Sequence, residues 1–487
     1  MTGAFNRVFL LKFDNGAEAA VHIPFPIVGN VGLSVASEVA TMRYVQERWR
    51  GTAFKDAPLP PSVFAWSTSH DNPAGTPYII LEYSPGVRLL DRWPHIQRDD
   101  TAAALKSIGS LETALLLEQF SQNGSIYSAG DVPEELRRRP LYQGDDDSLE
   151  DFARQLAPQY KIGPTVDREW WRGPYGSIDA DRGPWPDMQS MIRSAANFQL
   201  RALDTGAIDL ASSKVRSTPS DIPLLRRMLH MCIRIAPFVV PSDPALTAPT
   251  LNHPDLSLTN LIVPPDGPAT IRHSIDWQGA TVSPFCMQVS LPPAVAYTAD
   301  VIQLPRDGSE PSLPPDFDAR TPEEQEHIRL HLRYANRHNW YVIFAYAVHA
   351  GRAAVWSLPH GSSLAGLVTC ITRCVADGPV NLQRILIEFQ RIWPAIAADQ
   401  PGSTPCPIDF TPEEIASHDQ EVQRWEEYER NVAQLCEEIG CQNDGSVHAD
   451  DYEAAKVRME RLRDEWDEIV MKGPFPFFEG AYCYHLT

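Results

Sequence analysis

The beginning of the chain places its apolar residues in short runs bounded by polar turn residues, a pattern typical of strands. The runs at residues 7–13 and 17–23 are separated by Asp14-Asn15-Gly16, a sequence that favours a hairpin turn. Residues 34–49 instead show helical spacing and begin with serines suited to capping. Two further strands are predicted over residues 62–66 and 77–83. This order predicts a small α+β region.

Farther along the chain, the apolar positions follow helical spacing almost throughout. Helices are predicted over residues 101–120, 186–203, 222–235, 322–355, 360–377, 379–398, 411–440 and 448–471. Residues 129–185 are an exception, because their many Pro, Gly, Asp and Trp residues predict an irregular insertion. A strand-loop-strand unit is predicted within residues 250–277. The last two helices carry dense charge of both signs and belong to a predicted C-terminal helical extension over about residues 400–487.

The composition narrows the class of protein. The 487 residues are 43% hydrophobic and 22% charged, which is typical of a globular protein. Lys and Arg total 42 against 63 Asp and Glu, so the net charge is −21. This acidity argues against nucleic acid as a partner, because binding to nucleic acid depends on clustered Lys and Arg. It is compatible with a cationic small-molecule substrate, although solubility alone explains it more simply.

The cysteines and the apolar segments bear on the compartment. The eight cysteines are scattered without a CxxC pair, and no signal peptide is recognised, which predicts a reduced intracellular environment. The longest apolar stretch, residues 340–356, is interrupted by His349, Gly351 and Arg352. It is too short and too polar to cross a bilayer, so we expect a buried core helix and a soluble protein without a membrane span. The composition gives no indication of the oligomeric state.

Residues 251–263 have the sequence LNHPDLSLTNLIV, with candidate chemistry at His253, Asp255 and Asn260. A turn and a second predicted strand then lead to Asp276. In phosphoryl transfer, an Asp orients the attacking hydroxyl and accepts its proton, while an Asn and a second Asp bind the magnesium that neutralises the phosphates. The two strands bring Asn260 and Asp276 to neighbouring ends of one hairpin. His253 is expected to brace the loop by hydrogen bonds.

Each residue of this motif has a simpler interpretation when it is taken alone. An isolated Asp255 is more typical of a capping or turn aspartate, and an isolated His253 is more typical of a buried core histidine. The combination of the spacing, the apolar strand, the turn and the strand-terminal Asp276 favours phosphotransfer chemistry.

The chain resembles the aminoglycoside phosphotransferase and choline-kinase family, in particular the fungal group that includes the altered-inheritance-of-mitochondria proteins. The stretches that carry the resemblance are GAFNRVFLL (3–11), SEVATM (37–42), YIILEYSPG (78–86), GSIY (124–127), DRGPW (181–185) and the catalytic loop through IDWQ (275–278). No stretch is diagnostic by itself, but their order and spacing are. The resemblance extends from residue 3 to roughly residue 393 and continues more loosely into the tail.

The resemblance implies an α+β, protein-kinase-like fold with two lobes. Residues 1–86 would form a small antiparallel-sheet lobe, and residues 87–487 a large, mainly helical lobe that contains a catalytic loop at 251–277. It also implies an ATP-dependent phosphotransferase that uses Mg²⁺ and transfers the γ-phosphate to a hydroxyl of a small molecule. The sequence does not identify this acceptor.

The resemblance further implies roles for individual residues. Gly3 and Asn6 would belong to the turn that covers the phosphates, and Glu38 would face the strand residue that contacts them. The hinge whose backbone binds adenine would consist of Glu82, Tyr83 and Ser84. The catalytic base would be Asp255, supported by His253, and the magnesium ligands would be Asn260 and Asp276.

The chain departs from the family's pattern in two places. His22 occupies the position of the phosphate-binding Lys or Arg, and a histidine is only partly charged at neutral pH. In addition, Met1 lies almost on the glycine turn, so the strand that precedes this turn in the family is missing and the first lobe is expected to be truncated. We expect a cytoplasmic protein as the chain stands, and a mitochondrial one if an N-terminal segment is missing.

Two alternatives to a small-molecule kinase therefore stay open. One is a catalytically degenerate kinase-like protein that binds nucleotide or a partner, motivated by His22 and the missing strand. The other is a structural mitochondrial or cytosolic interaction protein, motivated by the long helical tail. Nucleotide binding separates the second alternative from the others, and turnover separates the first alternative from the kinase.

Overall fold

The computed structural model describes most of the chain. The described residues are 6–26, 29–50, 57–116, 118–144, 150–210, 215–289, 291–292, 295–305, 309–348, 350–358, 360–398, 404–441, 447, 451–473 and 475–477. They divide into two units, one within residues 1–379 and 391–407 and the other within residues 380–390 and 408–487. Gly3 lies outside the described residues.

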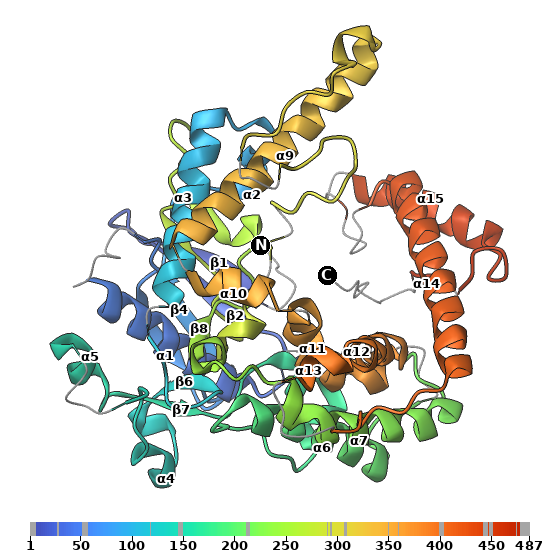
Figure 1. Ribbon diagram of the computed structural model, residues 1–487. Helices are drawn as coiled ribbons and strands as arrows, with labels where there is room; N and C mark the ends of the chain where they lie inside the picture. Colours follow the sequence, from blue (N-terminus) through green and yellow to red (C-terminus); the bar gives the residue numbers. More distant parts are fainter. Residues whose placement is uncertain are drawn as a thin grey trace. The chain divides into compact units, whose positions relative to one another are not determined.

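The first lobe is built on a four-stranded antiparallel sheet with the strand order β1-β2-β4-β3 (Figure 1). Its strands are β1 (Asn6–Lys12), β2 (Glu18–Pro24), β3 (Val63–Ser67) and β4 (Tyr78–Glu82). The hairpin of β1 and β2 confirms the predicted turn, since Gly16 adopts a φ of 81° there. In the register of the sheet, His22 stands opposite Val8 on one side and Ile79 on the other.

Helix α1 (Val31–Arg50) packs against this sheet. Val35, Val39 and Met42 recur at helical spacing and are at most 2% exposed. They join the buried Ile79 and Leu81 of β4 in one hydrophobic cluster. Burial of these side chains therefore fixes the face that α1 presents to the sheet.

The chain leaves the first lobe through residues 83–86 and enters β5 (Val87–Arg88). Strand β5 pairs with β9 (Leu261–Val263), so the hinge is joined directly to the segment that follows the HxDxxxxN motif. Gly86 has a φ of 151°, and a Cβ atom added to it would lie 2.4 Å from the Val263 carbonyl oxygen. Only glycine allows this close approach of two backbones.

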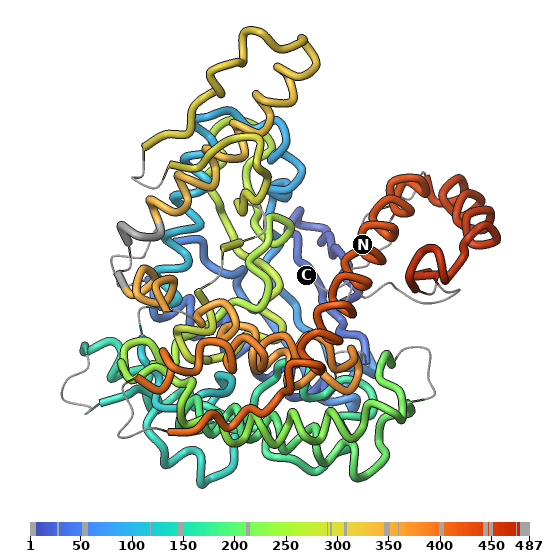
Figure 2. The backbone as a smooth tube through the Cα atoms, turned by 45° about the vertical axis from the view of Figure 1, so that its right-hand side comes forward, coloured from blue at the N-terminus to red at the C-terminus, as the bar shows by residue number. Residues whose placement is uncertain are grey.

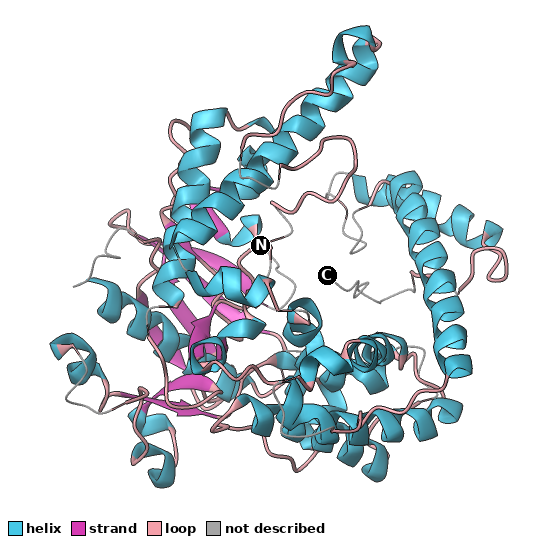
Figure 3. Ribbon diagram, in the orientation of Figure 1, coloured by secondary structure: helices cyan, strands magenta, loops and turns pink. Residues whose placement is uncertain are grey.

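The described part of the second lobe is mostly helical, and its strands are short (Figure 3). The longer helices of the first unit are α3 (Arg98–Leu115), α6 (Met188–Thr205), α7 (Ile222–Val239), α9 (Pro322–Val348) and α11 (Gly361–Asp377). The shorter ones are α2 (Leu89–Arg92), α4 (Glu134–Arg137), α5 (Asp151–Leu156), α8 (Pro244–Thr247), α10 (Ala350–Trp356) and α13 (Trp393–Ile396). Helix α3 lies beside α9, and α6 lies beside both α7 and α11 (Figures 1 and 2).

The second unit contains α14 (Pro412–Ile439), α15 (Tyr452–Glu465) and most of α12 (Val380–Arg391). Thr411 and Glu414 form a capping box at the start of α14. Helices α14 and α15 pack through an apolar cluster that includes Leu435, Ile439 and Leu462, while their other faces carry the predicted charges.

Three sequence-based element predictions need correction. The stretch 129–185 is not irregular throughout, because β7 (Tyr160–Gly163) pairs with β6 (Ser125–Ser128) in a hairpin. The helix predicted to reach residue 120 ends at Leu115, since the Phe120 N–H donates to Pro249 instead. The second strand predicted before Asp276 is limited to β10 (His273–Ser274), because Ala269 and Ile271 are buried in the core outside the described strands.

The architecture is the predicted α+β, protein-kinase-like fold. A small antiparallel sheet with one packed helix is connected by a hinge to a mainly helical lobe, and the β9–β10 strand pair lies next to that hinge. Among the described helices, none combines the length and apolar character needed to cross a membrane.

Gly86 provides a test of the hinge geometry. Gly86→Ala should lower the free energy of unfolding by roughly 2–4 kcal/mol, because the new Cβ forces the hinge and β9 apart. Gly75→Ala is the matched control, since Gly75 also has a positive φ, of 67°, but has nothing within 4 Å of an added Cβ. The control should cost only about 1 kcal/mol. Equal losses for the two variants in denaturant unfolding would contradict the close-approach argument.

Candidate functional site

Two loops form the centre of the candidate site. One runs from β8 (Pro249–Asn252) to β9 and carries the HxDxxxxN motif. The other runs from β10 to β11 (Thr281–Pro284) and carries Asp276. Because β8 pairs with β11 and β9 pairs with β10, the two loops are brought side by side. The Ile275 N–H donates to the Asn260 carbonyl at 2.9 Å and ties them together directly.

His253 connects the two loops through its imidazole. Its Nε2 lies 3.2 Å from the Ile275 carbonyl oxygen, and its Nδ1 accepts from the Asp255 N–H at 3.2 Å. Both bonds are satisfied only by the neutral ring with its proton on Nε2. Burial lowers the pKa of His253 to about 4, which keeps the ring neutral near pH 7. This is the bracing arrangement expected from the sequence.

Asn260 is buried, and its amide orientation is fixed by Asp255. The Asn260 Nδ2 donates at 2.9 Å to both the main-chain carbonyl and the Oδ2 carboxylate oxygen of Asp255. With the nitrogen side held in this way, the Oδ1 atom points away from Asp255 and is available as an oxygen ligand. Asp255 itself is exposed, so an acceptor molecule can reach its carboxylate.

Asp276 occupies an unusual backbone conformation, with a φ of 63°. Such a conformation is disfavoured for most residues but tolerated by Asp and Asn. Burial, together with the nearby negative charge of Asp255, raises the pKa of Asp276 to about 6. The two carboxylates are therefore close enough to repel each other.

Glu38 brings the first lobe to this site. It is 2% exposed on α1, and burial together with the charge of Asp276 raises the pKa of Glu38 to about 8. Its carboxyl group thus faces Asp276 from the opposite lobe. No ion pair or hydrogen bond within the described part of the chain joins Glu38 to His22.

His22 lies on β2 and is largely enclosed. Burial lowers the pKa of His22 to about 4, so the ring is uncharged at neutral pH. Its Nδ1 atom is buried without a hydrogen-bond partner among the described residues. The ring therefore offers hydrogen-bonding capacity on β2, but not a positive charge.

The three predicted hinge residues differ in what they contact. The Glu82 carboxylate accepts from the Ser62 N–H at 3.2 Å and so braces the neighbouring strand. Ser84 Oγ lies 2.6 Å from His273 Nδ1 and joins the hinge to β10. Tyr83 is half-buried between them. No sequence pattern predicts that His273 makes this contact.

A second contact between the lobes was also missed by the sequence analysis. The side-chain amides of Asn6 and Gln278 form a reciprocal pair, with donor–acceptor distances of 3.3 and 3.2 Å. Gln278 follows Asp276 by two residues, so this pair connects the start of β1 to the loop that carries Asp276. The IDWQ stretch contained Gln278, but its partner is 272 residues away in the sequence.

The donor atoms fit a magnesium ion. Mg²⁺ prefers hard oxygen ligands and usually combines one or two protein oxygens with water and substrate phosphates. Asn260 Oδ1 and the Asp276 carboxylate supply such oxygens, while Glu38, with a pKa of about 8, is mostly protonated near pH 7 as long as no cation is bound. No group of three or more His, Cys, Asp or Glu side chains within the described residues forms a self-contained metal site.

The chain is similar in sequence to several fungal proteins. The subtelomeric hrmA-associated cluster protein of Aspergillus fumigatus is 28% identical over 497 residues, which cover 95% of this chain and 91% of that protein. Altered inheritance of mitochondria protein 9 of Candida albicans is 23% identical over 455 residues, which cover 86% of this chain and 68% of that protein. The predicted resemblance to this fungal group is confirmed. No family model matches the chain.

Among solved structures, the aminoglycoside phosphotransferase APH(4)-Ia is similar over 77% of this chain and 91% of its own length. The identity is 17% and the TM-score is 0.33. The fold therefore rests on the strand order, the hinge and the β8–β11 and β9–β10 strand pairs of the chain itself.

The neutral state of His253 predicts a pH dependence of stability. Its pKa is about 4 in the folded chain and 6.5 in the unfolded chain, so between these values the unfolded state binds the extra proton. The contribution of neutral His253 to the free energy of unfolding is fully present above pH 6.5. It is lost as the pH falls towards 4, to a limit of roughly 3 kcal/mol. His253→Gln should flatten the denaturant stability profile in this window while lowering stability at neutral pH. His22 titrates in both proteins and cancels in the difference; parallel profiles would refute the assignment.

Proposed function

We propose that this chain is an ATP- and magnesium-dependent phosphotransferase that transfers the γ-phosphate to a hydroxyl group of a small molecule. The observation that carries the proposal is the arrangement of Asp255, Asn260 and Asp276 on two adjoining loops. The exposed carboxylate of Asp255 fixes the buried amide of Asn260. Asp276, with its positive φ, lies beside them. Bound magnesium would neutralise the phosphates and the developing charge on the transferred group.

The residues have distinct parts in this reaction. Asn260 and Asp276 would hold the metal, and His253 would keep their two loops in register. Asp255 would orient the acceptor hydroxyl and take up its proton as the new oxygen–phosphorus bond forms and the bond from the γ-phosphorus to the bridging oxygen breaks. The products are the phosphate ester and ADP, and the proton then passes from Asp255 to solvent.

A second candidate function is nucleotide binding without transfer, and a specific observation favours it. His22, at the position of the phosphate-binding cation, is buried and uncharged at neutral pH, and Glu38 lacks a cationic partner within the described residues. A site with this composition can still bind a metal–nucleotide complex. The acceptor would then be absent, and the protein would act through its nucleotide-bound state.

We propose a mitochondrial location for the protein. The Candida relative is named a mitochondrial protein, which supports a mitochondrial location for this chain over the cytoplasmic one predicted from the sequence.

Magnesium-dependent nucleotide binding is the first test. Mg-ATP should raise the melting temperature, because a ligand present at 100 times its Kd stabilises the folded state by about 2.7 kcal/mol. Asp276→Asn should remove most of this shift, since Asn tolerates the φ of 63° but lacks the charge. Asp266→Asn, in the exposed turn between β9 and β10, is the matched control and should retain it. A full shift in Asp276→Asn would rule out its role as a ligand.

Turnover provides the second test. In Asp255→Asn, the new amide oxygen can still accept from Asn260, so stabilisation by Mg-ATP should survive. Phosphoryl transfer should fall by a factor of about 10² to 10⁴, the usual contribution of a positioned general base. The measurement is product formation with the acceptor found by screening hydroxylated metabolites, again with Asp266→Asn as the control. Unchanged turnover would remove Asp255 from the chemistry. Mg-ATP binding without any acceptor would favour the second candidate.

A further inference from the structure

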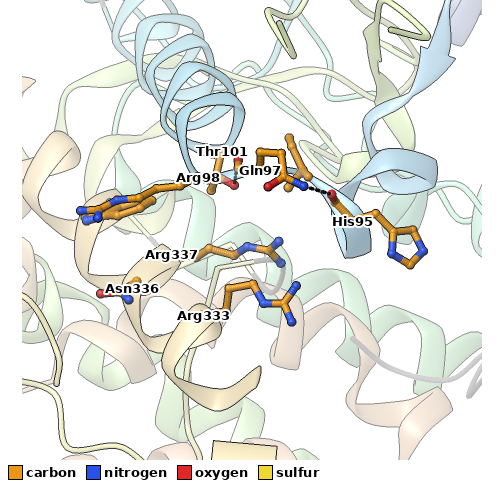
Figure 4. A pocket seen from close by; sticks show the side chains of 9 residues that line it. His95, Gln97, Arg98, Thr101, Arg333, Asn336 and Arg337 are labelled. Atoms are coloured by element: carbon orange, nitrogen blue, oxygen red, sulfur yellow. Dashed lines mark hydrogen bonds between the residues drawn. The ribbon is translucent and has the colours of Figure 1, made fainter. Parts of the chain in front are cut away.

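A pocket of about 230 Å³ lies outside the candidate site, between the start of α3 and the middle of α9 (Figure 4). One side is formed by residues 95–98 and Thr101, and the other by Arg333, Asn336, Arg337 and Trp340. None of these residues belongs to the constellation around Asp276. Along the chain, β5 and α2 connect Gly86 of the hinge to the residues that form the first side of the pocket.

The lining of this pocket is positively charged. It contains Arg98, Arg333 and Arg337 together with His95, and no Asp or Glu. Arg98 is already paired with Glu310 at 2.7 Å. Within the described residues, neither Arg333 nor Arg337 is within ion-pair distance of a carboxylate. In a chain with a net charge of −21, two unpaired arginines in one small pocket are unusual.

Arg337 is the central residue of the pocket. It is only 3% exposed, its guanidinium stacks 4.4 Å from the ring centroid of Trp93, and one Nη donates to the Trp93 carbonyl at 2.8 Å. Its Nε is buried without a hydrogen-bond partner among the described residues. Burial and the neighbouring Arg333 lower the pKa of Arg337 to about 10, so the group is still charged at neutral pH.

The contact with Trp93 explains only part of this arrangement. A buried guanidinium is costly unless its donors are satisfied by an opposite charge. Asn336, beside Arg337, adds a buried Oδ1 without a partner among the described residues, and its amide can turn to present Nδ2 instead. In Figure 4 the side chains of Arg333 and Arg337 extend in parallel across the same side of the pocket.

The start of α3 adds a weaker contribution. Its N-cap residue, Gln97, makes no side-chain cap hydrogen bond. The first N–H groups of this 18-residue helix, which begins at the pocket, therefore lack a bond from the N-cap side chain. Asp99 and Asp100 in the first turn partly offset the positive end of this helix. Asp100 is directed to Arg92 at 3.5 Å and lines a neighbouring depression instead. The arginines of α9 therefore dominate.

We propose that this pocket binds the phosphate group of a small, soluble phosphorylated compound, with Arg337 and Arg333 as its principal ligands. Guanidinium groups pair with phosphate oxygens through two parallel, charge-assisted hydrogen bonds. With a volume of about 230 Å³, the pocket is large enough for a phosphate and a few further atoms. Trp340 and Ile96 supply an apolar wall for the remainder of the compound.

The experiment is calorimetric titration of the full chain with inorganic phosphate, without magnesium, at matched ionic strength. Wild type should bind phosphate in the millimolar range or tighter. Arg333→Gln removes an exposed charge and should weaken binding about tenfold, the loss of one charge-assisted contact. Arg337→Lys keeps the charge but loses the planar fork, and should weaken binding by a similar factor. Arg329→Gln, an exposed arginine one turn earlier on α9, is the matched control and should bind as wild type does.

Three outcomes would overturn the proposal. One is the absence of phosphate binding by wild type at millimolar concentration, and another is equal affinity in Arg333→Gln, Arg337→Lys and wild type. The third is loss of phosphate binding in Asp276→Asn, which would place the anion in the candidate catalytic site instead. Equal binding of acetate and phosphate would overturn the choice of phosphate. The melting temperature of each variant, measured without ligand, separates lost binding from lost folding.

Discussion

The site depends on one neutral imidazole that holds two loops at a fixed spacing. His253 joins the Asp255 amide of one loop to the Ile275 carbonyl of the other, and its ring rests edge-on against Trp277 at 4.7 Å. Residues on either side of these bonds carry the proposed chemistry. Protonation of His253 would place an N–H donor at Nδ1 against the Asp255 N–H. The hydrogen bond between them, and with it the geometry of the two loops, therefore requires the neutral ring. Under the proposed function, burial of His253 therefore keeps the site in its working geometry by keeping the ring neutral.

The electrostatics of the site are dominated by uncompensated acid. Glu38 and Asp276 face each other across the lobes, each with a pKa raised by burial and by a neighbouring carboxylate. His22 cannot offset them, because its ring is uncharged at neutral pH. Near pH 7, Asp276 is mostly ionised and Glu38 is mostly protonated, and a bound cation would lower both pKa values and favour the ionised form of Glu38. Under the proposed function, the metal therefore has to supply the positive charge that a lysine would otherwise contribute.

The sequence predicted those parts of the molecule that depend on local pattern. The β1–β2 hairpin, α1 and the long helices follow from short-range periodicity and turn residues. The HxDxxxxN spacing and the Asp276 that follows it located the two central loops. Contacts between distant segments escaped prediction, as with Asn6 and Gln278 or Ser84 and His273, because a single sequence carries no signal for them. The length of β10 also depends on strand pairing. Residue propensity predicts a longer strand, but only His273 and Ser274 pair with residues of β9.

The position of Glu38 is set by contacts at the far end of α1. Arg48 is buried and forms ion pairs with Glu118 and Glu150, and the Tyr44 hydroxyl bonds to that of Tyr142 at 3.1 Å. Since all three partners belong to the second lobe, α1 is anchored there although it packs on the sheet of the first. A buried arginine that lost its carboxylates would be strongly destabilising, so the helix has little freedom to swing away. Its acidic side chain is consequently held against Asp276 by interactions that are remote from the site itself.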